Sequence, residues 1–94
     1  TNEAGWAAYF NRQTVFIERF PWAAGGVYPD FGVNCESYTT DFMLEMETLS
    51  PLCTLAPGEA VTHVETWSLV DVPCPDLSED ALAAVLSNRC HLAV

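Results

Sequence analysis

The chain has 94 residues, of which 50% are hydrophobic and 12% aromatic, so we expect one small folded domain over residues 1–94 and not a disordered segment. Its 13 acidic residues outnumber 3 basic ones and give a net charge of −10. An acidic chain without a basic stripe repels phosphate groups, so we expect neither nucleic acid nor a membrane surface as a partner. No apolar run reaches membrane-spanning length and no secretory signal is visible, which favours a cytoplasmic location, with secretion as the alternative.

The first 70 residues have the composition of β-strands separated by turns. Aromatic and β-branched runs on both sides of "NRQ" predict a hairpin. Residues 21–32, with two prolines and three glycines, predict a long surface loop of the kind that often carries function. Pro57 and Gly58 predict a turn before the last strand. The expected strands are 6–10, 14–20, 33–39, 42–49, 52–55 and 61–70.

The pattern changes to a helical period after residue 76. Leu82, Val85 and Leu86 have the spacing of one helix face, and Ser78 is a good N-cap residue, so we expect a helix over 78–89. The predicted fold class is therefore mostly β, an antiparallel sheet or sandwich with one C-terminal helix.

The four cysteines do not have the paired spacing of a zinc site. Cys35 and Cys53 lie in apolar, strand-like runs, which favours reduced and buried thiols. One disulfide bridge involving Cys74 or Cys90 is the alternative. We expect no cofactor, because Gly25–Gly26 is not followed by a helix as a nucleotide-binding loop would be.

Three glutamates occupy two of the expected strands. A two-residue turn at residues 40–41 would place Glu36 opposite Glu45 and Asn34 opposite Glu47, with all four side chains on one face of the sheet. Like charges that face each other across a strand pair are destabilising, so some compensation is expected.

Three ways of compensating the repulsion between these glutamates are possible. Water alone suffices if the face is exposed. A basic partner such as Arg19, or a proton shared between carboxyl groups, is the second. The third is a ligand, either a polyhydroxylated molecule or a calcium ion held by Glu36, Glu45 and Glu47.

The last expected strand contributes a second polar surface. His63, Glu65 and Trp67 alternate with other residues, so in a strand they would share one face. An imidazole, a carboxylate and an indole side by side are typical of a sugar-binding wall, because aromatic rings stack on the apolar side of pyranose rings.

Two stretches also resemble a known superfamily. "FMLEMET" (42–48) followed by "LAPGEAVTHVETWSL" (55–69) resembles the C-terminal strands of the galactose mutarotase-like superfamily, which includes the aldose 1-epimerases. The longer string "YPDFGVNCESYTTDFMLEMETLSPL" (28–52) is similar to a bacterial branch of that superfamily. The resemblance implies part of a β-supersandwich, with Glu45 at the position of the general base.

The same resemblance implies that the catalytic set is incomplete. The partner acid of the epimerases is a histidine from an earlier part of a longer sandwich, and His63 is not at its position. We therefore expect carbohydrate binding without turnover, with Glu45 catalytic only if activity remains. A partial sandwich leaves apolar surface uncovered, so we expect a homodimer.

Two functions follow from these observations. The first is binding of a neutral carbohydrate by Asn34, Glu36, Glu47, His63 and Trp67. The second is a non-enzymatic self-assembling or protein-interaction module, in which Trp22, Tyr28 and Phe31 of the 21–32 loop would line the interface.

Overall fold

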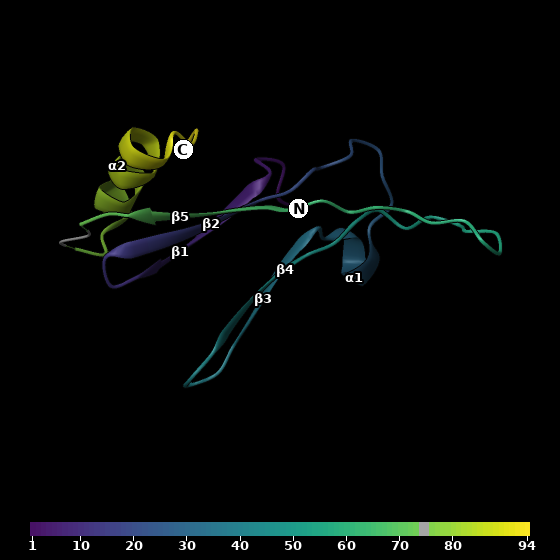
Figure 1. Cartoon of the computed structure of the whole chain (residues 1–94), viewed down its shortest axis with the longest axis horizontal. Coiled ribbons are helices and arrows are strands. Elements are labelled where there is room, and N and C mark those ends of the chain that lie inside the picture. Colours follow the sequence, from purple (N-terminus) through teal and green to yellow (C-terminus); the bar gives the residue numbers. More distant parts are fainter. Residues whose placement is uncertain (74–75) are drawn as a thin grey trace. The chain divides into compact units, whose positions relative to one another are not determined.

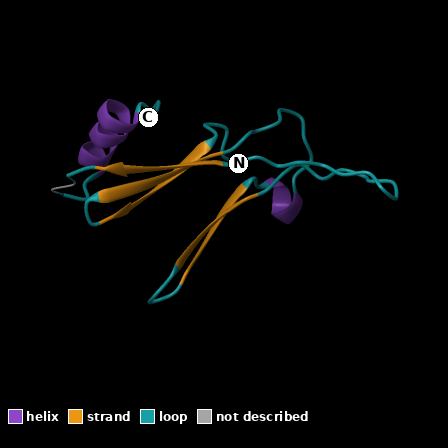
Figure 2. Cartoon of the chain, in the orientation of Figure 1, coloured by secondary structure: helices purple, strands orange, loops and turns teal. Residues whose placement is uncertain are grey.

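The computed structural model describes residues 1–73 and 76–94. It confirms the predicted fold class, since five strands form two antiparallel sheets and a helix follows near the C-terminus (Figures 1 and 2). The chain divides into two compact units: unit 1 comprises residues 1–5 and 19–65, and unit 2 comprises residues 6–18 and 66–94. The expectation of a single domain stays a prediction.

Unit 2 contains a three-stranded sheet in the order β1–β2–β5. The strands are β1 (Trp6–Asn11), β2 (Thr14–Arg19) and β5 (Thr66–Asp71). The predicted hairpin of β1 and β2 is confirmed, and its loop consists of residues 12–13. Beyond β5 the sheet is extended by one further bond, from the Val72 N–H to the Gln13 carbonyl at 2.7 Å.

One face of this sheet packs against helix α2 (Glu79–Cys90) (Figure 1). Because side chains alternate along a strand, Val15 and Ile17 point to the same side and are fully buried there. The core of unit 2 is completed by Val72 and by three residues of the helix and its C-terminal end, Leu86, Cys90 and Leu92.

Helix α2 begins as the sequence predicts. The Ser78 hydroxyl accepts a hydrogen bond from the Ala81 N–H at 3.3 Å, which is the N-cap arrangement. Two bonds from Ser78 to the Asp76 carboxylate, first that of the hydroxyl and then that of the N–H at 2.6 Å, lower the pKa of Asp76. None of the helices in the described part of the chain is both long and apolar enough to cross a membrane.

Unit 1 contains a two-stranded antiparallel sheet of β3 (Cys35–Thr39) and β4 (Leu44–Thr48). Glu36 lies opposite Glu47, and Tyr38 lies opposite Glu45. The predicted register, with Glu36 opposite Glu45, is therefore wrong by two residues. Because a shift of two preserves the alternation, the three glutamates still share one face.

The register differs because the connecting loop has four residues, 40–43, where two were expected. The Thr40 hydroxyl accepts bonds from the N–H groups of Phe42 at 3.4 Å and Met43 at 3.2 Å, and the Thr40 N–H donates to the Met43 carbonyl at 2.9 Å. A threonine that bonds to the next backbone groups stabilises a wider turn, which a strand-propensity argument does not include.

Residues 50–65 form no strand, so the strand expected at 52–55 is wrong and the one expected at 61–70 is replaced by β5, which begins at Thr66. Pro51 and Pro57 lack a backbone N–H, so they cannot donate a hydrogen bond to a neighbouring strand. The Pro57–Gly58 turn is confirmed: the Glu59 N–H donates to the Ala56 carbonyl at 3.0 Å, and Gly58 has a φ of 87°, as a type II turn requires.

The absence of a strand in residues 50–65 also bears on the predicted burial of the cysteines. Cys53 is exposed, because residues around it extend along the surface and do not enter a sheet, so its predicted burial is wrong. Cys35 is half-buried and Cys90 is part of the core of unit 2. Cys74, proposed for a disulfide bridge, lies outside the described residues.

The 21–32 loop ends in a single unusual turn, α1 (Pro29–Gly32). Asp30 and Phe31 have φ values of 51° and 65°, in the left-handed region that residues with a β-carbon seldom occupy. Phe31 is fully exposed as a result. Earlier in the loop, the Ala23 N–H donates to the Tyr28 hydroxyl at 2.9 Å, so the loop is held by its own bonds.

We predict that Val15→Ala lowers the free energy of unfolding by about 2 kcal/mol, because it removes two methyl groups from a fully buried site and leaves a cavity. Val94→Ala is the matched control, since Val94 is 64% exposed, and it should change stability little. Urea denaturation followed by circular dichroism measures both. Equal losses for the two variants would contradict the described core of unit 2.

Candidate functional site

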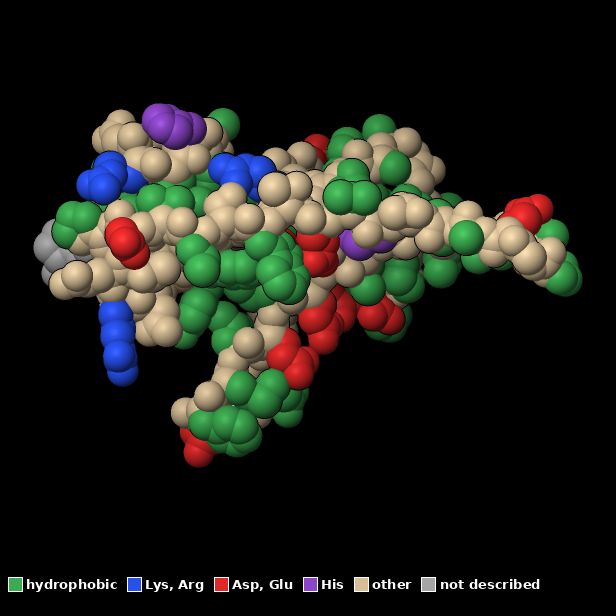
Figure 3. Space-filling model, viewed as in Figure 1, with side chains coloured by type: hydrophobic (Ala, Val, Ile, Leu, Met, Phe, Trp, Pro, Cys, Tyr) green, Lys and Arg blue, Asp and Glu red, His purple; other side chains and the backbone are tan. Residues whose placement is uncertain are grey.

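The shared face of the β3–β4 hairpin is strongly acidic (Figure 3). Glu36 and Glu47 are directly opposed, while Glu45 has Tyr38 as its cross-strand neighbour. Glu45 and Glu47 are exposed and Glu36 is half-buried. Most of this face is therefore open to solvent, which screens the charges.

Glu36 also lies beside Asp30 of α1. A hydrogen bond between the two side chains raises the pKa of Glu36, and burial and the negative charges of Asp30 and Glu47 raise it further. A bond between two carboxyl groups requires that one of them hold a proton. Proton sharing was one of the three expected compensations, and for Glu36 it is favoured first by Asp30 and less by Glu47 of the facing strand.

A calcium site at Glu36, Glu45 and Glu47 has no support in the structure. Among residues 1–73 and 76–94, no three acidic, histidine or cysteine side chains are grouped closely enough to hold a metal ion. Glu36 and Glu47 are directly opposed, but Glu45 lies two residues further along β4, opposite Tyr38.

Asn34 is fully buried and serves to join two segments of unit 1. Its side-chain oxygen accepts a bond from the Asn2 N–H at 2.6 Å, and its amide nitrogen donates to the Asn2 carbonyl at 2.9 Å. The Asn34 side chain thus makes the same pair of bonds to Asn2 as the backbone of a neighbouring strand would. Asn34 therefore holds the N-terminal segment in place and does not present its amide on the open glutamate face.

The expected wall of His63, Glu65 and Trp67 is divided between the two units. Residues 61–65 form no strand and belong to unit 1, whereas Trp67 lies in β5 of unit 2. There its ring meets the Phe16 ring edge to face, with centroids 5.7 Å apart. The predicted alternation does not hold here, because the strand begins at Thr66 and residues 61–65 are not part of it.

His63 and Glu65 nevertheless come together through Thr48. The Thr48 hydroxyl donates to the Glu65 carboxylate and also contacts His63 Nε2 at 2.8 Å. A hydroxyl has a single hydrogen, so with that hydrogen directed to Glu65 the oxygen accepts from His63 Nε2–H. This arrangement fixes the tautomer of His63 and leaves Nδ1 as the acceptor of the neutral ring.

Thr48 alternates with Glu47 along β4, so its side chain points to the opposite face of the hairpin. His63 therefore lies on the side away from Glu36, Glu45 and Glu47. The candidate residues from the sequence form two separate groups within unit 1, an acidic face and a His63–Thr48–Glu65 cluster, and Trp67 belongs to neither.

A hollow of about 330 Å³ adjoins this cluster in unit 1. Trp22 and Tyr28 supply aromatic surface, and His63 with Ser50 and Thr62 supplies polar groups. Tyr28 is buried and its hydroxyl is bonded to the backbone, so the aromatic side of the hollow is preformed. We call this region the Trp22 hollow.

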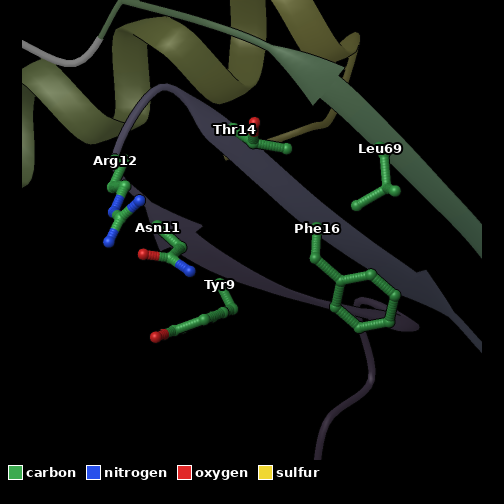
Figure 4. Close-up of a pocket in the computed structure, with 6 residues that line it drawn as sticks. All are labelled: Tyr9, Asn11, Arg12, Thr14, Phe16 and Leu69. Carbon is green, nitrogen blue, oxygen red and sulfur yellow. The ribbon is translucent and has the colours of Figure 1, made fainter.

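A second hollow of about 290 Å³ lies in unit 2, on the face of the sheet opposite to α2 (Figure 4). It is lined by Tyr9, Asn11, Arg12, Thr14, Phe16 and Leu69. We call it the Arg12 hollow.

Neither hollow was predicted from the sequence. The Trp22 hollow combines residues from two connecting segments that are far apart in the sequence, and only Trp22, Tyr28 and His63 stood out in the sequence. For the Arg12 hollow a signal existed: Tyr9, Asn11, Thr14 and Phe16 alternate along the two strands of the predicted hairpin, on the side opposite to Val15 and Ile17.

Comparison of the chain with protein-family models, with curated proteins and with solved structures gives no match.

We predict that Glu36→Gln removes a pH dependence of stability. Folded Glu36 keeps its proton to a higher pH than unfolded Glu36, so the folded state binds more protons in that window and the free energy of unfolding falls as pH rises above the ordinary value of 4.5. Relative to the wild type, Glu36→Gln should gain stability as pH rises towards neutral. Urea denaturation at a series of pH values measures the difference.

Glu45→Gln makes the same charge change on the same face, opposite Tyr38. It should keep the slope of the wild type. A parallel response of the two glutamine variants would rule out the Asp30–Glu36 contact as the cause.

Proposed function

We propose that the chain binds a neutral carbohydrate in the Trp22 hollow and does not turn it over. The observation that carries this proposal is the His63–Thr48–Glu65 cluster, which holds an imidazole in a fixed orientation on the wall of a hollow that contains Trp22. Sugars need both an aromatic surface for the ring and oriented polar groups for the hydroxyls, and the hollow offers both.

The size of the hollow supports a small ligand. At about 330 Å³ it lies at the lower end of the range for ligand sites, which suits one or two sugar rings that remain partly exposed. Ser50 and Thr62 add hydroxyl groups that donate and accept bonds, as sugar hydroxyls do.

The position of Glu45 supports binding without turnover. Resemblance to the mutarotase-like superfamily makes Glu45 the general base, yet its side chain projects from the face of β4 opposite to Thr48. A base must lie within hydrogen-bond reach of the proton that it removes. Membership of that superfamily is part of this proposal.

We predict that Thr48→Val weakens sugar binding about tenfold, because it removes the hydroxyl that orients His63 while preserving the shape of the side chain. Trp22→Ala should abolish binding. Chemical-shift titration with a panel of neutral mono- and disaccharides measures both. Thr39→Val, the same change at an exposed site on the hairpin, is the control and should bind as the wild type does. Flat titrations of the wild type across the panel would contradict the proposal.

The second candidate function is self-assembly, and the edge of the β3–β4 sheet favours it. In the part of the chain that the structure describes, this sheet has two strands, and an isolated two-stranded hairpin is marginally stable in water. Phe42 at its tip is 83% exposed and Tyr38 is 58% exposed. Pairing with the same edge of a second copy would extend the sheet to four strands and bury apolar surface.

The hydrogen-bond pattern identifies the groups available for such pairing. The bonds Leu49 N–H to Asn34 carbonyl and Thr40 N–H to Met43 carbonyl mark the closely bonded pairs, which alternate along the ladder. Ser37 falls between them, so its N–H points away from β4.

We predict that the chain is a homodimer and that Ser37→Pro converts it to a monomer, because proline removes the outward N–H without breaking a bond within the hairpin. Sedimentation velocity at micromolar concentration measures the change, and circular dichroism verifies that the variant folds. A monomeric wild type would contradict self-assembly as the function.

A further inference from the structure

The solvent-facing side of the three-stranded sheet in unit 2 carries a second hollow with a different chemistry. Val15, Ile17 and Val72 point towards α2, so Thr14, Phe16 and Leu69 point to the opposite side, where no element of unit 2 covers them in the described residues. Leu69 is 74% exposed and Tyr9 is 41% exposed. Apolar side chains therefore remain open to solvent beside polar ones.

The Arg12 hollow has a polar end and an apolar end. Figure 4 shows the Arg12 guanidinium, the Asn11 amide and the Tyr9 hydroxyl at one end, and the Phe16 ring and the Leu69 side chain at the other. Trp67 extends the apolar end, since its ring packs edge to face on Phe16. A ligand that fits must combine a polar group with an apolar one.

Arginine is an unfavourable residue for the backbone conformation at position 12. It has a φ of 58°, in the left-handed region, and lies in a two-residue hairpin loop where glycine, asparagine or aspartate is favoured. It is also one of only 3 basic residues in a chain of net charge −10. The tight hairpin turn requires this backbone conformation, so an arginine in place of glycine, asparagine or aspartate is locally unfavourable.

The donors at the polar end match a carboxylate. Guanidinium forms paired bonds with the two oxygens of a carboxylate, and the amide of Asn11 and the hydroxyl of Tyr9 supply further donors. Thr14 has its hydroxyl hydrogen directed to Asp71 at 3.4 Å, so it adds an acceptor and no donor. The volume of about 290 Å³ limits the ligand to one ring with a short side chain.

We propose that the Arg12 hollow binds a small monocarboxylate that carries a flat apolar ring. Its carboxylate bonds to Arg12 and Asn11, and its ring packs against Phe16 and Leu69. This site lies in unit 2 and is independent of carbohydrate binding in unit 1.

Three probes of one shape test the ligand class: phenylacetate, its neutral amide and the cationic phenethylamine. Nitrogen-15 chemical-shift titration of the whole chain at millimolar probe concentrations should shift the signals of residues 9–16 and of Leu69, with phenylacetate bound about tenfold more tightly than the amide. Equal binding of phenylacetate and the amide, tighter binding of the amine, or no shift at these residues would overturn the proposal.

Variants locate the two ends of the ligand. Arg12→Gln should abolish the preference for phenylacetate over the amide, while Leu69→Ala, at an exposed site, should weaken both probes equally. Arg19→Gln makes the same charge change outside the hollow and should keep the preference. Circular dichroism verifies the fold of each variant. Loss of the preference in Arg19→Gln would show a general charge effect and overturn the assignment to Arg12.

Discussion

The alternation of side chains across the β3–β4 ladder determines what unit 1 can do. Glu47 and Thr48 are neighbours in the chain and point to opposite faces of the hairpin. One face therefore carries the carboxylates of Glu36, Glu45 and Glu47, and the other provides the hydroxyl that joins His63 to Glu65. This separation places an oriented imidazole beside the Trp22 hollow and directs the acidic groups away from it.

Side chains also alternate along the strands of unit 2, where the two faces of the sheet differ in burial. The inner side chains of its sheet pack against α2 and supply the core, and the outer ones form a surface with aromatic rings at one end and a guanidinium at the other. The core and the exposed surface of unit 2 thus depend on alternate residues of the same strands. A substitution at Val15 acts on the fold, whereas one at Phe16 acts on the exposed surface.

The sequence predicted the strand-rich class, the first hairpin, the Pro57–Gly58 turn and the C-terminal helix, because each depends on local patterns: alternation, turn residues and an N-cap. The face shared by the three glutamates was also predictable, since a shift of two residues preserves it. The register itself was not, because it depends on bonds from the Thr40 hydroxyl to the following backbone. The His63–Thr48–Glu65 cluster joins a strand to a distant loop, so no local pattern reveals it.

The division of the chain into units has a consequence for how the fold assembles. The backbone passes between the units at residues 5–6, 18–19 and 65–66, so neither unit is a continuous segment. Strand β5 reaches its place beside β2 only after the whole of 19–65 has been synthesised, and closing such a long loop slows folding. A chain cut before Thr66 would keep the β3–β4 hairpin but lose an edge strand and the helix together. Unit 2 is thus completed only when residues 66–94 have been synthesised after the long 19–65 segment.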